Sequence, residues 1–145
     1  MNTYENCHEI IPNLFLGNYL IANDIEFLKS LGITHILNCS IEHPMYFPNE
    51  FVYLHLPIHD IFSQNILQYL NETYEFINKS TRVYVHCHAG ISRSSSITIA
   101  YLMKKYSINF QKALKYVQSI RKIVEPNEGF QIQLECYEDE VFRSI

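Results

Sequence analysis

The chain has no excess of positive charge. It contains 11 Lys and Arg against 15 Asp and Glu in 145 residues, which gives a formal net charge of −4. Proteins that bind nucleic acid normally present a basic face to the phosphate backbone. We therefore expect no nucleic-acid partner, although positive potential can gather locally around Arg93, Arg121 and Lys122.

Long apolar stretches are also missing. No run approaches the 18 or so apolar residues that a membrane-spanning helix needs. Residues 1–6 have neither the basic nor the apolar part of a secretory signal, and Asn2 excludes N-myristoylation. Residues 142–145 do not form a prenylation motif. These absences predict a protein that makes no use of a membrane.

Paired cysteines are absent too. Cys7, Cys39, Cys87 and Cys136 form no C-x-x-C pair and have no zinc-site spacing. The chain also lacks internal repeats, low-complexity tracts and linkers. With 48% hydrophobic and 18% charged residues, its length suits one globular domain, 1–145.

The most informative segment that is present is HCHAGISR, residues 86–93. Before it, residues 82–85 alternate and are β-branched, which predicts a buried strand. After it, residues 94–103 are apolar without Gly or Pro, which predicts a helix. A strand, a tight loop and a helix start place unpaired N–H groups and about half a positive charge around one point. This arrangement predicts an anion-binding cradle.

The side chains of this loop suit phosphate chemistry. A thiol at the mouth of the cradle, Cys87, is expected to ionise more easily than a free cysteine, whose pKa is about 8.5. The planar fork of Arg93 can hold two phosphate oxygens, and Gly90 lets the backbone approach the anion closely. The same geometry therefore activates a nucleophile and seats its target, as in an enzyme with a phosphocysteine intermediate.

The pattern His-Cys-x-x-Gly-x-x-Arg is that of the cysteine-dependent protein tyrosine phosphatases, and with Ser94 following it the chain resembles the dual-specificity branch. The resemblance extends over most of the chain, through residues 11–17, 31–38, 100–103, 113–117 and 125–130. It implies a dual-specificity phosphatase catalytic domain over residues 1–145. Since nothing precedes the matching region, we expect no docking domain of the kind found in larger members.

The pattern of apolar residues predicts an α/β fold. We expect extended structure with a turn at 10–16, strands at 34–39, 51–56 and 82–85, and helices at about 93–106, 109–121 and 127–142. Asn23 with Glu26 predicts the capped start of a short helix that ends at Gly32, and Ser63 predicts the start of a long one. The result is a single domain with a central, mostly parallel twisted sheet of about four or five strands flanked by helices, phosphatase-like, with the catalytic loop at a strand-to-helix junction.

The sequence offers two candidates for the general acid. An acid must protonate the poor leaving group of a phosphoester, and the resemblance assigns this role to Asp60. His59 is an alternative acid. Asp60 or Ser63 could also serve only to cap the following helix.

The remaining site residues have supporting roles. We expect Ser94 to hydrogen-bond the sulfur and stabilise it as a leaving group. His86 is expected to orient the loop through backbone groups, and Asn127, which matches the family's Pro-Asn pair, either braces the loop or caps a helix. The substrate phosphate is expected to be held by the loop residues His88, Ala89, Gly90, Ile91, Ser92 and Arg93.

The predicted mechanism has two steps and needs neither a metal nor a cofactor. Cys87 attacks phosphorus while Asp60 protonates the departing oxygen, and water activated by Asp60 then hydrolyses the thiophosphate. The loop amides and Arg93 supply the positive field that Mg²⁺ provides elsewhere. A metal site of His86, Cys87 and His88 is disfavoured, because adjacent strand residues point to opposite faces.

The expected substrates are proteins that carry phosphotyrosine and phosphoserine or phosphothreonine. Relatives of the family also act on phosphoinositides, glucans or RNA 5′ ends, but the lipid-directed ones carry lysines where this chain has Ile91 and Ser92. A phosphopeptide-binding pseudophosphatase would usually lack the cysteine, and a cysteine protease has no use for Gly90 and Arg93. We expect a signalling enzyme that is monomeric and cytoplasmic, with the nucleus as a second compartment, since a reactive thiol needs a reducing environment.

Cys39 allows one further hypothesis. Its predicted strand should lie beside that of the motif, so a reversible disulfide with Cys87 could protect the nucleophile from over-oxidation. The alternative is that Cys39 is only a small buried apolar residue.

Overall fold

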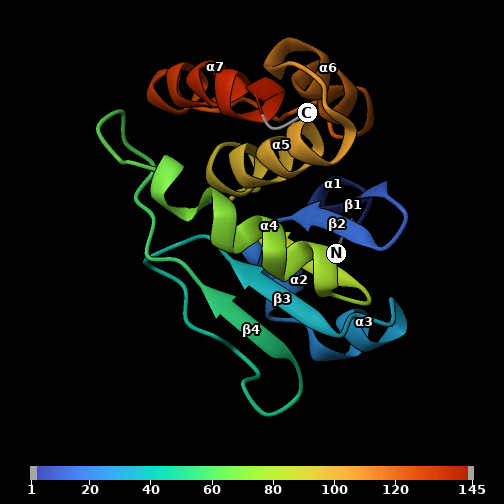
Figure 1. Cartoon of the computed structure of the whole chain (residues 1–145). Coiled ribbons are helices and arrows are strands. Elements are labelled where there is room, and N and C mark those ends of the chain that lie inside the picture. Colours follow the sequence, from blue (N-terminus) through green and yellow to red (C-terminus); the bar gives the residue numbers. More distant parts are fainter. Residues whose placement is uncertain (1–2, 144–145) are drawn as a thin grey trace.

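The computed structural model describes residues 3–143 and has a five-stranded sheet at its centre (Figure 1). The strand order is β1 (Cys7–Ile11), β2 (Leu14–Gly17), β5 (Val83–His86), β3 (His35–Asn38) and β4 (Val52–His55). The pair of β1 and β2 is antiparallel and the other neighbours are parallel. The predicted fold class, an α/β domain with a mostly parallel sheet, is confirmed.

Helices cover both faces of this sheet (Figure 1). One face carries the four longer helices, α4 (Leu70–Lys79), α5 (Arg93–Tyr106), α6 (Phe110–Ile120) and α7 (Glu128–Arg143). The other face carries α2 (Tyr19–Ala22) and α3 (Ile25–Ser30), and α1 (Thr3–Asn6) precedes β1. The molecule therefore has three layers, with the sheet in the middle.

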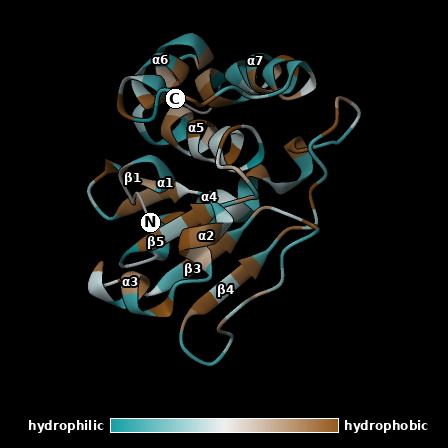
Figure 2. Ribbon diagram, turned by 180° about the vertical axis from the view of Figure 1, so that it is seen from behind, coloured by the Kyte–Doolittle hydropathy of each residue, from teal (hydrophilic) through white to brown (hydrophobic). Residues whose placement is uncertain are grey.

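The two hydrophobic cores follow from the alternation of side chains along the strands. In β5, Val83 and Val85 pack into the core under the four longer helices, whereas Tyr84 packs into the core under α2 and α3. Figure 2 shows the hydrophobic colour concentrated in the strands. Because β5 is buried on both faces, the loop at its carboxyl end starts from a rigid position.

A tight hairpin joins β1 to β2, and β2 pairs with β5. Asn13 adopts a positive φ of 74° at the turn, and its backbone N–H donates to a carboxylate oxygen of Glu9. The parallel register then places Gly17 opposite His86, directly before the motif loop. The amino-terminal hairpin thus forms one wall of the candidate site.

Two predicted helix starts are wrong. The helix expected from Ser63 begins only at the 3₁₀ turn η1 (Leu67–Tyr69), which runs into α4. The side-chain oxygen of Gln133 on α7 accepts hydrogen bonds from the N–H groups of Ile66 and Leu67, so a tertiary contact decides this helix start. The cap of α3 is Asp24, whose side chain accepts from Phe27, rather than the expected Asn23.

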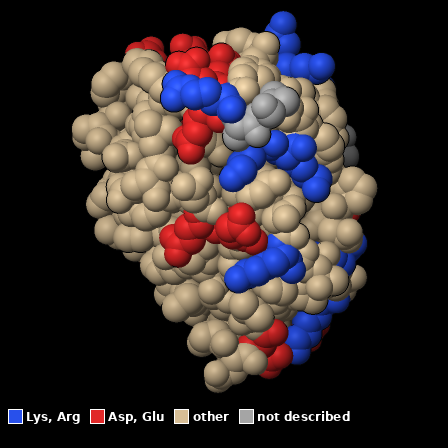
Figure 3. All heavy atoms as spheres, in the orientation of Figure 1, with Lys and Arg blue, Asp and Glu red and all other residues tan. Residues whose placement is uncertain are grey.

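The surface has charges of both signs in close proximity. On the face shown in Figure 3, Lys and Arg side chains lie beside Asp and Glu side chains instead of forming one basic patch. Between residues 3 and 143, no helix is both long and apolar enough to cross a membrane.

Candidate active site

The motif loop follows β5 and leads into α5, and its carbonyl groups are all engaged. They accept hydrogen bonds as follows: Cys87 from His86 Nδ1 (3.1 Å), His88 from the Tyr19 N–H (3.0 Å), Ala89 from Arg121 Nη2 (3.0 Å), Gly90 from Arg121 Nε (2.9 Å), Ile91 from the Glu125 N–H (2.9 Å) and Ser92 from the Ser96 N–H (2.9 Å). The surrounding protein therefore fixes the oxygen side of this backbone.

The N–H side of the same backbone is free. Among residues 3–143, no group accepts a hydrogen bond from the backbone N–H of residues 88–93. The following N–H groups belong to the first turn of α5, where an α-helix offers no internal acceptors. Unpaired N–H groups around a buried loop are costly unless a ligand satisfies them, and successive free amides form an anion-binding nest. The loop therefore has the free N–H groups that the predicted anion-binding cradle needs.

Gly90 is required by the shape of this loop. Its φ of +68° lies in the left-handed region that side chains rarely adopt. A Cβ built on it would lie 2.5 Å from the carbonyl oxygen of Gly17 and 2.8 Å from Arg121 Nη2. Both the backbone conformation and the hairpin wall therefore exclude a larger residue here.

The thiol of Cys87 lies at the start of the loop, beside α5. Its Sγ atom is 3.1 Å from the hydroxyl oxygen of Ser94, and only 3% of Cys87 is exposed. The expected contact between Ser94 and the sulfur is therefore present. A hydroxyl at this distance can donate to a thiolate and stabilise its negative charge.

Glu42 holds Arg93 in position. The two guanidinium nitrogens Nη1 and Nη2 each donate to a carboxylate oxygen of Glu42 at 2.6 Å, and Nη1 also donates to the Ile58 carbonyl at 3.0 Å. These bonds use both N–H groups of Nη1 and one of Nη2, which leaves the parallel N–H pair of Nε and Nη2 for an anion. The hydrogen bonds from Arg93 hold the pKa of Glu42 at about 2. The sequence analysis missed Glu42, because it lies 51 residues before its partner.

Asp60 is linked to the loop through Asn127. The side-chain amide of Asn127 donates to Asp60 Oδ1 at 2.9 Å, and its backbone N–H donates to the Ser92 hydroxyl at 2.9 Å. Asn127 Oδ1 also accepts from the Phe130 N–H and so caps α7. The two roles left open for Asn127 therefore occur together. For His59, the contact shown is from its backbone N–H to Gln64.

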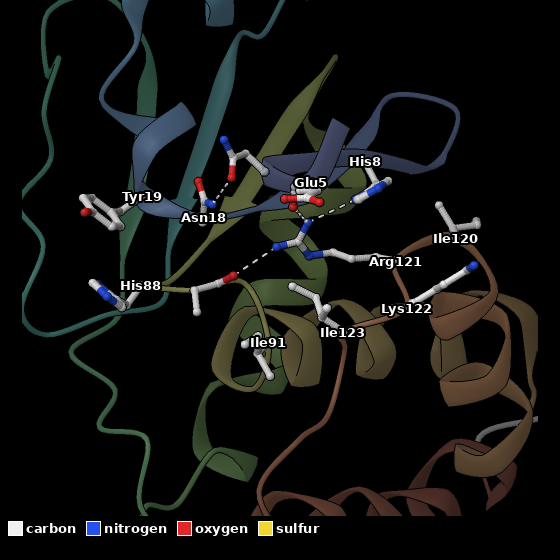
Figure 4. A pocket seen from close by; sticks show the side chains of 12 residues that line it. Glu5, His8, Asn18, Tyr19, His88, Ile91, Ile120, Arg121, Lys122 and Ile123 are labelled. Carbon is white, nitrogen blue, oxygen red and sulfur yellow. Dashed lines mark hydrogen bonds between the residues drawn. The ribbon is translucent and has the colours of Figure 1, made fainter. Parts of the chain in front are cut away.

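Arg121 lies beneath the loop and was not identified as a site residue from the sequence. Besides the carbonyls of Ala89 and Gly90, its guanidinium donates to the Glu5 carbonyl at 2.7 Å and to His8 Nδ1 at 3.1 Å. Figure 4 shows this side chain at the wall of a pocket of about 670 Å³ beside the loop. Because Arg121 is fully buried, its guanidinium binds the loop carbonyls and does not add to the positive surface potential that the sequence suggested. Nothing in the sequence indicates this burial, since Arg121 lies between the end of α6 and the exposed Lys122.

His86 is buried beneath the loop. Its Nδ1 donates to the carbonyl of Cys87, and its ring stacks on that of Tyr84 with centroids 5.8 Å apart. Burial lowers the pKa of His86 from 6.5 to about 4, so the folded protein keeps this ring neutral at pH values where an unfolded chain protonates it.

This burial predicts a pH-dependent stability. Between the folded pKa of His86, about 4, and the unfolded value of 6.5, the unfolded chain binds more protons, so acidification through this window favours unfolding. We expect the contribution of His86 to lower the free energy of unfolding by about 2 kcal/mol between pH 7.5 and pH 5. Urea denaturation at both pH values should show a smaller loss for His86→Asn than for the wild type. Equal losses in the two proteins would contradict this role.

Cys39 lies directly after β3, which is the neighbour of β5 in the sheet, as predicted. Its side chain is fully buried, and burial together with the nearby Cys87 raises the pKa of the Cys39 thiol well above its usual range. The proposed disulfide with Cys87 stays a prediction.

Comparison with known proteins identifies the family. Residues 14–140 match the family model of the dual specificity phosphatase catalytic domain. The chain belongs to this family. The motif loop of this chain carries the Cys, Gly and Arg of the pattern that the sequence analysis associated with this family.

Several relatives and solved structures resemble this dual-specificity phosphatase domain. A Slingshot homolog protein phosphatase of Xenopus laevis is 41% identical over 134 residues, which cover 90% of this chain and 19% of the relative. Dual specificity protein phosphatase 1-A of the same species is 39% identical, with coverages of 92% and 37%. The human tyrosine phosphatase-like serine/threonine/tyrosine-interacting protein is 38% identical with a TM-score of 0.89, and 95% and 99% of the two chains align. The chain spans about a fifth of the length of the first of these relatives.

Proposed function

We propose that the chain is a cysteine-dependent phosphatase that hydrolyses phosphotyrosine and phosphoserine or phosphothreonine in proteins. The observation that carries this proposal is the loop from Cys87 to Arg93, in which the carbonyls are bonded outward and the N–H groups are unpaired. A phosphate dianion satisfies these groups, and the sulfur of Cys87 lies at the start of the same loop.

In the first step, the thiolate of Cys87 attacks phosphorus in line with the leaving oxygen. The loop amides and the free N–H pair of Arg93 hold the equatorial oxygens, where negative charge is spread in the transition state. Asp60 protonates the departing oxygen, and its hydrogen bond from Asn127 fixes the carboxyl group relative to the loop. The S–P bond forms as the P–O bond breaks, which leaves a phosphocysteine.

In the second step, water attacks phosphorus and Asp60 accepts its proton. The S–P bond breaks and Cys87 leaves as a thiolate, which the hydroxyl of Ser94, 3.1 Å from the sulfur, stabilises. Inorganic phosphate then departs from the loop. In this scheme the guanidinium of Arg93 and the backbone dipoles supply the positive field, so the reaction needs no metal ion.

The surroundings of the loop support a protein substrate. Exposed apolar side chains flank both functional carboxylates, with Ile61 and Phe62 next to Asp60 and with Ile41 next to Glu42. Such side chains can pack against a tyrosine ring or a peptide, whereas an inositol phosphate or glucan offers mainly hydroxyl groups. We also propose a monomer that works in the cytoplasm or nucleus, because its thiol must stay reduced.

Hydrolysis of defined substrates tests this function. We expect phosphate release from phosphotyrosine and phosphothreonine peptides and from para-nitrophenyl phosphate, with inhibition by orthovanadate. Faster turnover of a phosphoinositide than of every peptide would favour the lipid alternative. Tight binding of a phosphopeptide without turnover would indicate a pseudophosphatase.

The role of Asp60 predicts a change in the pH profile. Asp60→Asn removes the transferable proton but keeps an acceptor for Asn127, so turnover of a phosphotyrosine peptide should fall by about 10²-fold or more. The decrease of kcat/KM at alkaline pH should also disappear, because that limb reports loss of the acid's proton.

His59→Gln is the matched control for this prediction. It changes the neighbouring side chain on the same loop, and we expect it to keep the alkaline limb of the wild-type profile. If the limb disappears in His59→Gln and remains in Asp60→Asn, His59 is the acid instead.

A further inference from the structure

Two histidines and a glutamate meet at the rim of the cradle. His43 and Glu42 come from the connection between β3 and β4, and His88 directly follows the nucleophile. His43 Nε2 lies 2.9 Å from His88 Nδ1, and one possible ligand atom from each of Glu42, His43 and His88 lies within 4.8 Å of the others. Long-range folding therefore brings together a set of side chains that metal ions prefer.

Aromatic contacts hold these rings in place. Tyr19 stacks on His43 and on His88, with centroid distances of 4.5 and 4.7 Å and interplanar angles of 14° and 9°. Tyr19 and His88 lie at one end of the pocket in Figure 4. His43 Nδ1 also forms a 2.8 Å hydrogen bond with the hydroxyl of Tyr46. Such outer contacts set the orientation of a metal-binding imidazole and fix its tautomer.

The ligand chemistry suits Zn²⁺. In the structure, His43 Nε2 and His88 Nδ1 share a hydrogen bond, so one of them carries a proton. When His43 instead carries its proton on Nδ1, which donates to Tyr46, and His88 carries its proton on Nε2, both facing nitrogens have a lone pair for a metal ion. A tetrahedral zinc ion with Zn–N bonds of about 2.0–2.1 Å separates two ligand nitrogens by roughly 3.3 Å, so the rings need to move apart only slightly. A carboxylate oxygen of Glu42 completes a His₂-carboxylate set, and a fourth position stays open.

We propose that Glu42, His43 and His88 form an inhibitory site for Zn²⁺ beside the catalytic loop. The inhibition rests on the proposed phosphatase function, whereas the binding does not. Glu42 is the connection between the two sites, because its carboxylate also holds both terminal nitrogens of Arg93. Zinc draws this carboxylate toward the histidines and weakens its hold on Arg93, which then loses the orientation that phosphate binding needs.

Binding is tested in the Cys87→Ser protein, where the catalytic thiolate cannot take the metal. Titration with Zn²⁺ against a chromophoric chelator should show one site, and adding His43→Gln should weaken its affinity by about 100-fold or more, because a direct ligand is lost. His35→Gln is the matched control, since His35 lies on β3 outside the cluster. Equal zinc affinity with and without His43→Gln would overturn the site.

Cobalt gives an independent readout of the ligands. Co²⁺ bound to Cys87→Ser should show the visible absorption of a tetrahedral site without a thiolate charge-transfer band, and His43→Gln should abolish this absorption. A strong thiolate band would mean that another cysteine, such as the exposed Cys136, binds the metal, and would contradict the proposal.

Inhibition is tested with the active protein and a phosphotyrosine peptide. Zn²⁺ should reduce turnover reversibly, EDTA should restore it, and His43→Gln should require at least tenfold more zinc for the same inhibition. His43→Gln without zinc should work at about the wild-type rate, since His43 takes no part in the reaction. Equal zinc sensitivity of the two proteins would overturn the inhibitory role. A protein without any phosphatase activity would refute the proposed function, and the binding assays would still decide the metal site.

Discussion

Replacing Cys87 with Ser should reduce turnover of a phosphotyrosine peptide by about 10⁴–10⁶-fold, the loss seen when a covalent nucleophile is removed. A serine hydroxyl needs a general base, and the loop provides none. His86 Nδ1 is already committed to the Cys87 carbonyl, and the ring is fully buried. The neighbouring Ser94 is itself a neutral hydroxyl and cannot accept the proton efficiently.

The same variant should still bind the substrate. The amide groups of the loop and the free N–H pair of Arg93 are unchanged in this variant. We therefore expect its dissociation constant for a phosphopeptide to stay within about tenfold of the wild-type value, measured without vanadate and before turnover. Calorimetry measures the binding, and phosphate release measures the turnover. Cys136→Ser is the control, because it makes the same chemical change at an exposed position on α7. Turnover by Cys87→Ser at the rate of this control would exclude the phosphocysteine mechanism.

Replacing Arg121 with Met should lower the free energy of unfolding by about 3–5 kcal/mol, because three carbonyls in buried or partly buried hydrogen bonds lose their donor together. Met keeps most of the apolar length of the side chain but provides no N–H groups. The carbonyls of Glu5, Ala89 and Gly90 would then be unpaired. Since two of these belong to the motif loop, phosphate affinity should fall as well.

Lys122→Met is the matched control for Arg121→Met. It removes a positive charge from the next residue, whose side chain is exposed, and should change the stability by less than about 0.5 kcal/mol. Urea denaturation of both variants at neutral pH measures the difference. A loss below about 1 kcal/mol in Arg121→Met would show that the guanidinium does not hold the loop.

The parts of the molecule that follow from local sequence were predictable. The alternation before Cys87 and the apolar run after it place the motif between a strand and a helix, which is where β5 and α5 lie. The helix expected at 109–121 is α6, and it begins where Asn109 acts as the cap, since the Asn109 side chain accepts from the Lys112 N–H. In these cases, neighbours along the chain determine the structure.

The parts that depend on distant contacts were not predictable from one sequence. Glu42 contacts Arg93 across 51 residues, and nothing in the connection between β3 and β4 distinguishes it from an exposed acidic residue. The start of α4 likewise depends on Gln133, which is 67 residues away from Ile66. Local capping preferences cannot anticipate such partners. The proposed nucleophile was therefore visible in the sequence, whereas the residues that position its partners were not.

The outward hydrogen bonds of the motif loop make catalytic competence a property of the complete domain. Tyr19 and Glu125 each bond one carbonyl of the loop and Arg121 bonds two, and these residues belong to segments on opposite sides of the motif in the sequence. A proteolytic fragment that ends before Arg121 would contain the entire motif and still lose the shape of its backbone. Partial unfolding at either terminus is therefore expected to abolish the proposed activity before the central sheet unfolds.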